Sequence, residues 1–300
     1  MSATVLVLAA VIAVIQQSLT DAVMDGDVAA VQTAIAEGVD VNAADAQGVT
    51  ALMRAASAGR IDLVRLLLAA KADVNAANSD GATALTAAAF GGYGGVVELL
   101  LAQHADAKQH DKQGRTPLMA AAVNGHLDVV RALLASGADP QAADAAGGNA
   151  VTYAAGGGHA DILEALIKIG GRVRDGDVVL AAEGCHADAI AAMLGHGAPA
   201  NAARNGRSAL FMATSSHCID VVQLLVAKGA DVNARSASDG RTALMQAAGD
   251  GQVEIVRLLL DHGADAEARD EAGRSAWTYA AMAGQQEIAD LFRKAREKKP

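Results

Sequence analysis

Apolar residues recur at helical spacing in short stretches along this chain. Residues 61–68 read IDLVRLLL and residues 253–260 read VEIVRLLL, with apolar side chains at positions i, i+3, i+4 and i+7. This spacing predicts amphipathic helices that bury one face. A glycine follows several of these stretches, where its freedom to adopt a left-handed conformation commonly ends a helix. These glycines are Gly38, Gly137, Gly197, Gly229 and Gly263.

A second, alanine-rich helix is predicted ahead of each of these stretches. Its clearest form begins at Gly114 with GRTPLMAAAVNGH, and Gly48 and Gly240 begin close copies. Thr116 stands where a hydroxyl can cap the first turn of a helix, and Pro117 stands where a proline is tolerated. A pair of alanines recurs seven and eight residues after the opening glycine, so this helix can approach its neighbours closely. The chain is therefore predicted to be a series of helix–turn–helix units.

These units recur at a fixed period. Gly48, Gly81, Gly114 and Gly147 follow one another at intervals of 33 residues. A fixed period of this length is typical of a solenoid, in which each unit covers the apolar faces of its neighbours. Extended stretches, such as DVNA at residues 73–76, lead from one unit to the next. We count nine units, which begin near Ile15, Gly48, Gly81, Gly114, Gly147, Arg174, Gly206, Gly240 and Gly273.

Over residues 16–292 this pattern resembles the ankyrin-repeat family. The resemblance implies an all-α fold, an ankyrin-repeat solenoid of stacked helix–turn–helix units with projecting β-turn fingers. It also implies a non-catalytic function in protein–protein interaction, through the concave surface of the array. The histidine that the family usually carries after the leucine is absent. Met53, Met119 and Met245 stand there in three units and threonine stands there in three others, so we expect a weaker tie between the helix start and the turn.

Two irregularities predict a seam in the middle of the array. Unit five is six residues short, with the loss after Gly170, so we expect it to lack a finger. Unit six lacks the usual opening and restarts near Asp177 like an N-terminal cap. We therefore expect repeats 1–5 in residues 16–172 and repeats 6–9 in residues 173–292, followed by a basic tail in residues 293–300.

The N-terminal segment, residues 1–15, differs from the repeats. Residues 5–15 read VLVLAAVIAVI and are apolar on every side. The run is shorter than the roughly 20 residues of a membrane-spanning helix, and it has the length of a signal-peptide core. No basic residue precedes it, which counts against a signal. We interpret the segment as a signal peptide of a periplasmic or secreted bacterial protein, or else as a buried cap of a cytoplasmic one. We expect no membrane insertion once a signal is removed.

The composition of the chain argues against several classes of function. The chain is 52% hydrophobic but only 2% aromatic, so alanine, leucine, valine and isoleucine must fill the core. Its net charge of −10 argues against a nucleic-acid partner, because phosphates require a basic face. No Gly-x-Ser-x-Gly elbow, His-Glu-x-x-His pair or phosphate loop is present. We therefore expect neither enzymatic activity nor a cofactor.

The two cysteines occupy nearly equivalent places in adjacent units, each beside a histidine: Cys185-His186 and His217-Cys218. The resemblance implies about 10 Å between equivalent atoms of adjacent repeats, whereas a disulfide needs Cα atoms within about 7 Å. We therefore favour two separate thiols. A Cys185–Cys218 disulfide remains an alternative, favoured by a secretory signal. A zinc site of two cysteines and two histidines is the third, although the ligand spacing is unusual.

The resemblance also implies which residues contact a partner. The family binds through its finger tips, through the residue after each opening glycine and through the turn after the alanine pair. Arginine recurs after the opening glycine and could form a basic stripe, although arginine is also common there in the family. The residues expected at the interface are Phe90, Arg115, Asn124, Glu183, Arg207, Ser215, Arg241, Asp250 and Arg274.

We expect the chain to be a monomer that binds an unidentified protein. Two other functions stay open. The first is that of a dedicated inhibitor or protective partner of an enzyme produced by the same cell. The second is that of a redox or metal-binding protein that uses Cys185, His186, His217 and Cys218.

Overall fold

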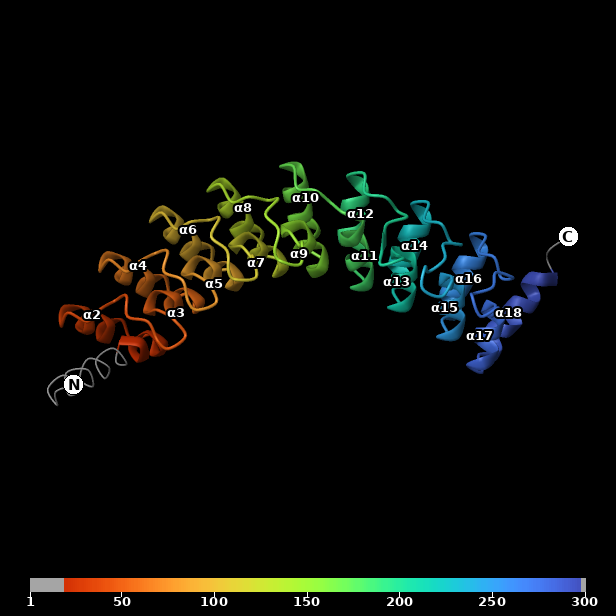
Figure 1. Ribbon diagram of the computed structural model, residues 1–300, viewed down its shortest axis with the longest axis horizontal. Coiled ribbons are helices and arrows are strands. Elements are labelled where there is room, and N and C mark those ends of the chain that lie inside the picture. The colour runs from red at the N-terminus through yellow and green to blue at the C-terminus, as the bar shows by residue number, and fades with distance from the viewer. Residues whose placement is uncertain (1–18, 298–300) are drawn as a thin grey trace. The chain divides into compact units, whose positions relative to one another are not determined.

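The computed structural model describes the backbone of residues 19–297 and side chains as far as Arg293 (Figure 1). The apolar segment 1–15 lies outside these residues, and so does most of the basic tail. By its contacts the chain divides into two compact units, residues 1–153 and 154–300. No helix in the described part is both long and apolar enough to cross a membrane.

The predicted all-α fold is confirmed in both units. In the first unit residues 19–25 are helical, and the further helices are α2 (Val28–Ala36), α3 (Ala51–Ser57), α4 (Ile61–Ala69), α5 (Ala84–Gly91), α6 (Gly94–Ala102), α7 (Pro117–Val123) and α8 (Leu127–Ala135). Helix α9 (Ala150–Gly157) contains the point at which the two units divide. The second unit continues with α10 (Ala160–Lys168), α11 (Asp175–Glu183), α12 (Ala187–Gly195), β1 (Ala203–Arg204), β2 (Arg207–Ser208), α13 (Ala209–Ser215), α14 (Ile219–Ala227), α15 (Ala243–Gly249), α16 (Val253–Asp261), α17 (Ala276–Met282) and α18 (Gln286–Glu297).

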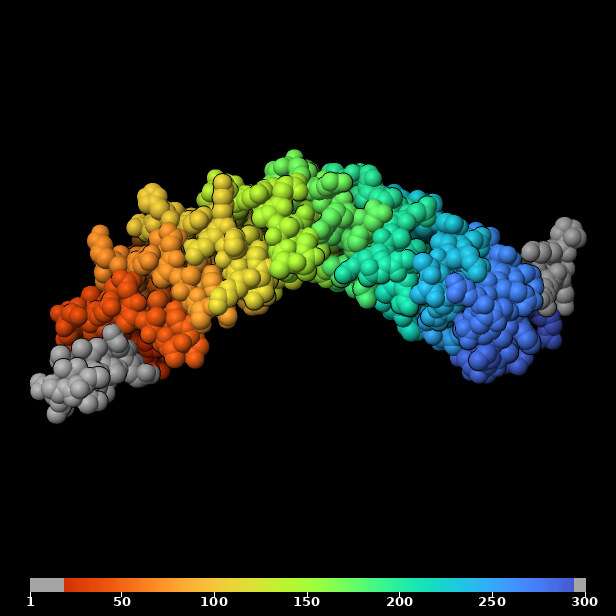
Figure 2. All heavy atoms as spheres, in the orientation of Figure 1, coloured from red at the N-terminus to blue at the C-terminus, as the bar shows by residue number. Residues whose placement is uncertain are grey.

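The helices of each unit form two layers. In the first unit α3 packs on α5 and α5 on α7, while α4 packs on α6 and α6 on α8 (Figure 1). In the second unit α11, α13, α15 and α17 form one layer, and α12, α14, α16 and α18 form the other. Within each unit consecutive repeats follow one another without a gap in the space-filling view (Figure 2). Each repeat therefore covers only its neighbours, as the period predicts.

Small and branched side chains make the core. Both alanines of each recurring pair are fully buried from Ala55-Ala56 to Ala247-Ala248, which lets adjacent first helices approach closely. The second helices supply larger side chains, such as the fully buried Leu63, Val64 and Leu67 of α4. Full burial of one such side chain is worth about 1.5–3 kcal/mol, so these layers dominate the stability.

The predicted helix caps are confirmed. Thr50, Thr83, Thr116 and Thr242 each accept a hydrogen bond at Oγ1 from the backbone N–H three residues later, at 3.2 to 3.3 Å. Several of the residues that replace the missing histidine contact the backbone N–H at the helix start. In α9 the Oγ1 of Thr152 accepts a hydrogen bond from Asn149 N, and in α7 the Sδ of Met119 lies 3.5 Å from Thr116 N.

Four of the fingers are built around an aspartate three residues before the opening glycine, namely Asp45, Asp111, Asp144 and Asp270. Oδ1 of Asp111 accepts hydrogen bonds at 2.9 Å from the backbone N–H groups of Gln113 and Arg115, and so closes the turn. Adjacent fingers are also joined, because Ala145 N donates to the carbonyl of Gln113 at 2.8 Å. This approach requires Gly114, which has φ +78°, since a Cβ there would lie 3.1 Å from the Asp144 backbone.

Unit five lacks a finger, as predicted. The residues between α10 and α11 form no bridge or finger turn, as the six-residue loss predicts. Arg174 stands at the N-cap of α11, where several other repeats have a threonine, and Oδ2 of Asp177, three residues later, accepts a 2.9 Å hydrogen bond from Arg174 N. The two compact units divide at residues 153 and 154 rather than near 172. The seam between residues 172 and 173 therefore stays a prediction about stability.

Candidate functional site

The fingers and the first helices of the repeats form one face of each unit, which we call the finger face. The arginines that follow the opening glycines lie on it, but they do not form a free basic stripe. Arg115 pairs with Asp111 at 2.7 Å and Arg241 with Asp239 at 2.6 Å. Arg274 pairs with Asp270 at 2.8 Å in the same way. The expected stripe is therefore largely neutralised by finger carboxylates close to each arginine.

Arg207 differs from the other three arginines. No ion pair is found for it in the described part of the chain. Its guanidinium lies 5.6 Å from the centre of the Phe211 ring, and that of Arg241 lies 5.8 Å from the same ring. Phe211 is almost fully buried, so the two arginines cover it, and cation–π attraction helps to order them.

A groove of about 410 Å³ opens on the finger face of the first unit, and we call it the Phe90 groove. It lies over α5 and α7 and reaches Tyr153 of α9. Phe90 is 60% exposed although it is large and apolar. The groove brings together two predicted interface residues, Phe90 and Arg115. It is lined by Ser57, Ala82, Thr86, Ala87, Phe90, Gly91, Asp111, Arg115, Thr116, Met119, Ala120, Val123 and Tyr153.

Polar contacts fix the rim of the Phe90 groove. Nε of Arg115 donates to Asp111 Oδ2, and this hydrogen bond raises the pKa of the guanidinium. The hydroxyl of Tyr153 donates to Asp144 Oδ2 at 2.7 Å. Burial and this hydrogen bond together raise the pKa of Tyr153 to about 12. The phenol therefore stays neutral and donates at any physiological pH.

A second hollow, of about 250 Å³, lies between α15 and α17 on the finger face of the second unit. We call it the Met282 hollow, because Met282 stands 71% exposed on its wall. It brings together the predicted residues Arg241 and Asp250. Its lining consists of Arg241, Met245, Gln246, Gly249, Asp250, Tyr279, Met282 and Ala283.

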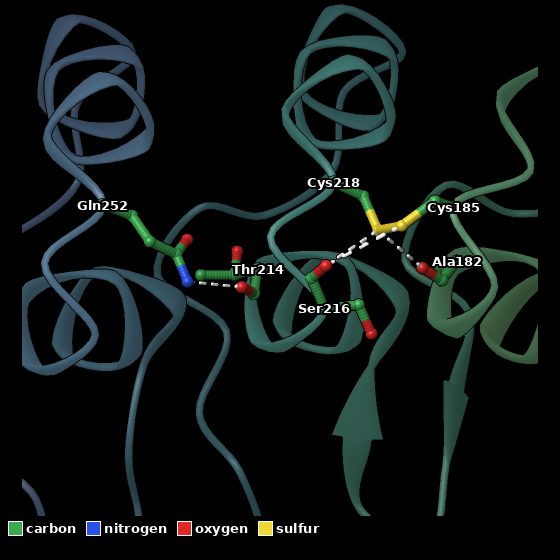
Figure 3. Close-up of a disulfide and its surroundings, with 6 residues drawn as sticks. All are labelled: Ala182, Cys185, Thr214, Ser216, Cys218 and Gln252. Carbon is green, nitrogen blue, oxygen red and sulfur yellow. Dashed lines mark hydrogen bonds between the residues drawn. A yellow bond between two sulfur atoms is a disulfide. The ribbon is translucent and has the colours of Figure 1, made fainter.

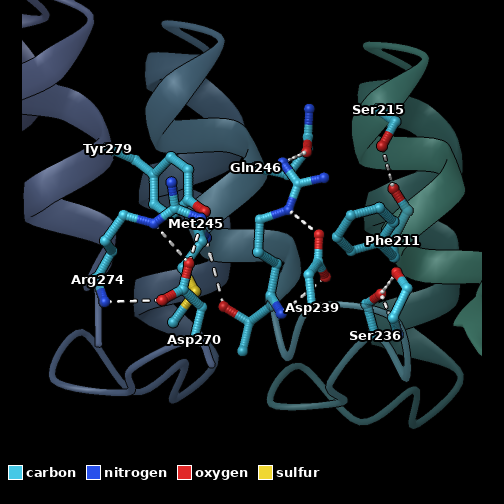
Figure 4. Close-up of polar contacts among 12 residues, drawn as sticks. Phe211, Ser215, Ser236, Asp239, Met245, Gln246, Asp270, Arg274 and Tyr279 are labelled. Atoms are coloured by element: carbon cyan, nitrogen blue, oxygen red, sulfur yellow. Dashed lines mark hydrogen bonds and ion pairs between the residues drawn. The ribbon is translucent and has the colours of Figure 1, made fainter. Parts of the chain in front are cut away.

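Beside the Met282 hollow, Asp270 anchors a network of hydrogen bonds (Figure 4). Its Oδ2 accepts hydrogen bonds from Tyr279 Oη at 2.7 Å and from Arg274 Nε at 2.8 Å. Burial acts to raise the pKa of this carboxyl, but hydrogen bonds from the Arg274 backbone, Tyr279 and the Arg274 side chain outweigh it. The pKa is lowered to about 2. The guanidinium of Arg274 also lies 4.9 Å from the centre of the Tyr279 ring, so the wall of the hollow is fixed.

The other predicted interface residues lie outside both lining sets. Asn124 donates from Nδ2 to the carbonyls of Phe90 and Ala120, so it joins two repeats. The hydroxyl of Ser215 donates to the carbonyl of Phe211 within α13. Glu183 is exposed at the end of α11.

A larger hollow of about 590 Å³ lies on the last repeat, around Trp277 of α17 and Phe292 of α18. Ala281 is exposed there, whereas the second alanine of the earlier pairs is covered by a following repeat. Arg293, the last residue whose side chain the structure describes, lines this hollow.

The expectation of two separate thiols is wrong, because Cys185 and Cys218 form a disulfide with Cα atoms 5.3 Å apart (Figure 3). The two residues are not equivalent. Cys185 lies in the left-handed turn position of its repeat, at φ +61°, while Cys218 comes one position later in the next repeat. Side chains at that later position reach back toward the preceding repeat, as Gln252 does when it donates to the Thr214 carbonyl at 2.9 Å. The distance argument from equivalent atoms therefore does not apply.

The zinc alternative finds no support in this geometry. The two sulfur atoms bond to each other, so neither is a thiolate. Nε2 of His186 lies 3.0 Å from the carbonyl oxygen of Gly156, in the preceding repeat. Among the residues described, no three histidine, cysteine or acidic side chains gather in a way that could hold a metal ion.

Sequence reasoning missed the carboxylates and tyrosines that organise the finger face. Asp111, Asp144 and Asp270 each stand three residues before an opening glycine, and Tyr153 and Tyr279 each stand six residues after one. The recurrence of these aspartates and tyrosines can be seen in the sequence, but the hydrogen bonds between them cannot.

Stacked helical hairpins, joined by fingers along one face, define a repeat solenoid. A family model described as ankyrin repeats matches residues 19–111, 92–177, 178–236 and 234–299. The chain therefore belongs to the ankyrin-repeat family. Among the curated proteins, none matches this chain. Ankyrin repeats generally mediate protein–protein interaction, and proteins built from them are typically non-catalytic scaffolds.

Proposed function

We propose that this protein is a non-catalytic, monomeric scaffold that binds a protein partner through its finger face, with the Phe90 groove as the central contact. The observation that carries the proposal is the 60% exposure of Phe90 on the rim of a preformed groove with many apolar lining residues. Exposed aromatic side chains beside such grooves are typical anchors of interfaces. Arg115, Met119 and Tyr153 would frame the bound side chain.

The groove favours a large apolar side chain of the partner. Ala87, Val123 and Phe90 offer apolar surface, and the charge of Arg115 is balanced by Asp111. Burial of an apolar side chain here would release water without burying an unpaired charge. The contact should therefore depend weakly on ionic strength, unlike one carried by a free basic stripe.

A random peptide library displayed on phage tests the role of Phe90. We expect peptides selected on the wild-type protein to bind the Phe90→Ala variant at least about tenfold more weakly, the loss typical of an aromatic anchor. Ile61→Ala is the matched control, because Ile61 is an exposed apolar residue of α4 that does not line the groove. Equal affinity for Phe90→Ala and wild type would contradict the proposal.

We also propose that the mature chain acts outside the cytoplasm, in the periplasm or as a secreted protein. The Cys185–Cys218 disulfide supports this location, because such bonds persist in oxidising compartments. The apolar run at residues 5–15 points the same way. Counting of free thiols in protein taken from its native cells tests the proposal. We expect both cysteines to be blocked, and two free thiols would overturn it.

A further inference from the structure

The Phe90 groove and the Met282 hollow share a frame of side chains. Arg241, Met245 and Tyr279 each follow their counterparts Arg115, Met119 and Tyr153 by 126 residues. In both places the arginine pairs with a finger carboxylate, and the methionine is buried. In both places the tyrosine donates to an aspartate nine residues before it, at 2.7 Å. Each unit thus carries one version of the same arrangement.

The two versions differ in the residues that fill the frame. Ala120, Val123 and Asn124 correspond to Gln246, Gly249 and Asp250. At Gly249 a Cβ would lie 3.5 Å from the Tyr279 ring, so the missing side chain leaves the ring edge open to the hollow. The Met282 hollow is therefore smaller and more polar than the Phe90 groove, with Met282 as its exposed apolar wall.

Asp250 gives the Met282 hollow an uncompensated negative charge. Its Oδ2 accepts hydrogen bonds from the side-chain amides of Gln246 at 2.7 Å and Gln252 at 3.3 Å. No partner for its Oδ1 is found among the described residues, and no cation there pairs with it. Arg241 does not neutralise it, because its guanidinium bonds to Asp239 at 2.6 Å and to Gln246 at 3.0 Å.

We propose that the Met282 hollow is a second binding site, which takes an arginine side chain of a protein partner. The guanidinium would donate to Asp250 Oδ1, while its aliphatic stem would lie along Met282 and the edge of Tyr279. Arginine suits the site because its planar head bonds to carboxylates and its stem packs on apolar surface. The net charge of −10 on the chain also attracts a basic partner. This inference does not depend on the Phe90 groove.

Methionine-methyl NMR with N-acetyl-arginine methylamide as the probe tests the site. We expect a saturable shift of the Met282 methyl signal, which Met282→Leu would identify by its loss. Asp250→Asn should weaken the response at least about tenfold, because it removes the charge and keeps an acceptor for the two glutamine amides. Asp261→Asn is the matched control, since it makes the same charge change at an exposed residue of α16 outside the hollow.

A second variant tests the shape of the hollow. Gly249→Val introduces the side chain that Val123 provides in the Phe90 groove, and Gly249 has a helical backbone that accepts it. We expect the variant to fold and to lose the response to the arginine probe. The uncharged probe N-acetyl-norleucine methylamide should produce a much weaker shift of Met282.

The proposal is overturned if Asp250→Asn responds to arginine as the wild type does. It is also overturned if norleucine methylamide binds equally well or if the Met282 signal does not saturate. The outcome is separate from that for the Phe90 groove, because Phe90→Ala should leave the arginine response of Met282 unchanged.

Discussion

A single carboxylate in this protein can both close a finger turn and hold the side chains of the finger face. Asp270 closes a finger turn through its Oδ1, which accepts from Arg274 N at 2.7 Å. Its Oδ2 fixes the side chains of Arg274 and Tyr279. Asn78 closes the turn of another finger in the same way, with 2.9 Å hydrogen bonds to its Oδ1. The backbone role therefore needs only an acceptor, while the charge serves the neighbouring side chains.

The pKa of Asp270 predicts a pH-dependent contribution to stability. Its folded-state pKa of about 2 lies below its usual value of 3.8, so the ionised form favours folding. That contribution is fully present above pH 3.8 and is lost as the pH falls toward 2. We expect Asp270→Asn to be less stable than wild type at pH 6, with a difference that shrinks as the pH falls below 4.

Urea unfolding at several pH values measures this difference. Asp261→Asn, at an exposed position on α16, should show no comparable trend. A constant difference between Asp270→Asn and wild type from pH 6 to pH 2.5 would show that the charge of Asp270 does not contribute.

At the scale of elements, the contacts between repeats are made by the same positions each time. The residue just before each second helix reaches back to the preceding repeat, as His126 Nε2 does toward the Phe90 carbonyl at 3.1 Å. Cys218 occupies this position and bonds to Cys185 instead. The two cysteines of the disulfide are 33 residues apart in the sequence. In the chain-entropy account, closing such a loop stabilises the fold by about 3–4 kcal/mol, which exceeds a single hydrogen bond.

At the scale of the molecule, stability in a solenoid is roughly a sum of terms for the repeats and their interfaces. A weak interface near residues 170–177, where a finger is missing, should let the repeats before and after it unfold separately. We therefore expect two transitions when the whole chain unfolds in denaturant. A reductant should shift only the transition of residues 173–292, because that part contains the disulfide.

Circular dichroism and the fluorescence of Trp277, the chain's one tryptophan, monitor the two transitions. Trp277 lies in α17, so its fluorescence should follow the later repeats alone. The double variant Cys185→Ser/Cys218→Ser should show the reduced behaviour without reductant. One transition that both signals share would count against the seam.

Much of the architecture could be predicted from the sequence because it depends on local and periodic interactions. Thr116 caps the helix that starts at the next residue, and the loss after Gly170 removes a finger. A 33-residue period forces each repeat to cover its neighbour, so the buried alanine pairs follow from the pattern alone. These features can be predicted without knowing which side chains of neighbouring repeats contact each other.

Only the tertiary structure decided the surface chemistry. The sequence could not show that Asp111 neutralises Arg115, that Cys218 reaches Cys185, or that Gly249 leaves the Tyr279 ring open. Such contacts depend on side-chain direction and on the offset between stacked repeats, to within a few ångströms. A one-position difference along the turn was enough to bring two cysteines within bonding distance, because side chains at successive positions point to different neighbours.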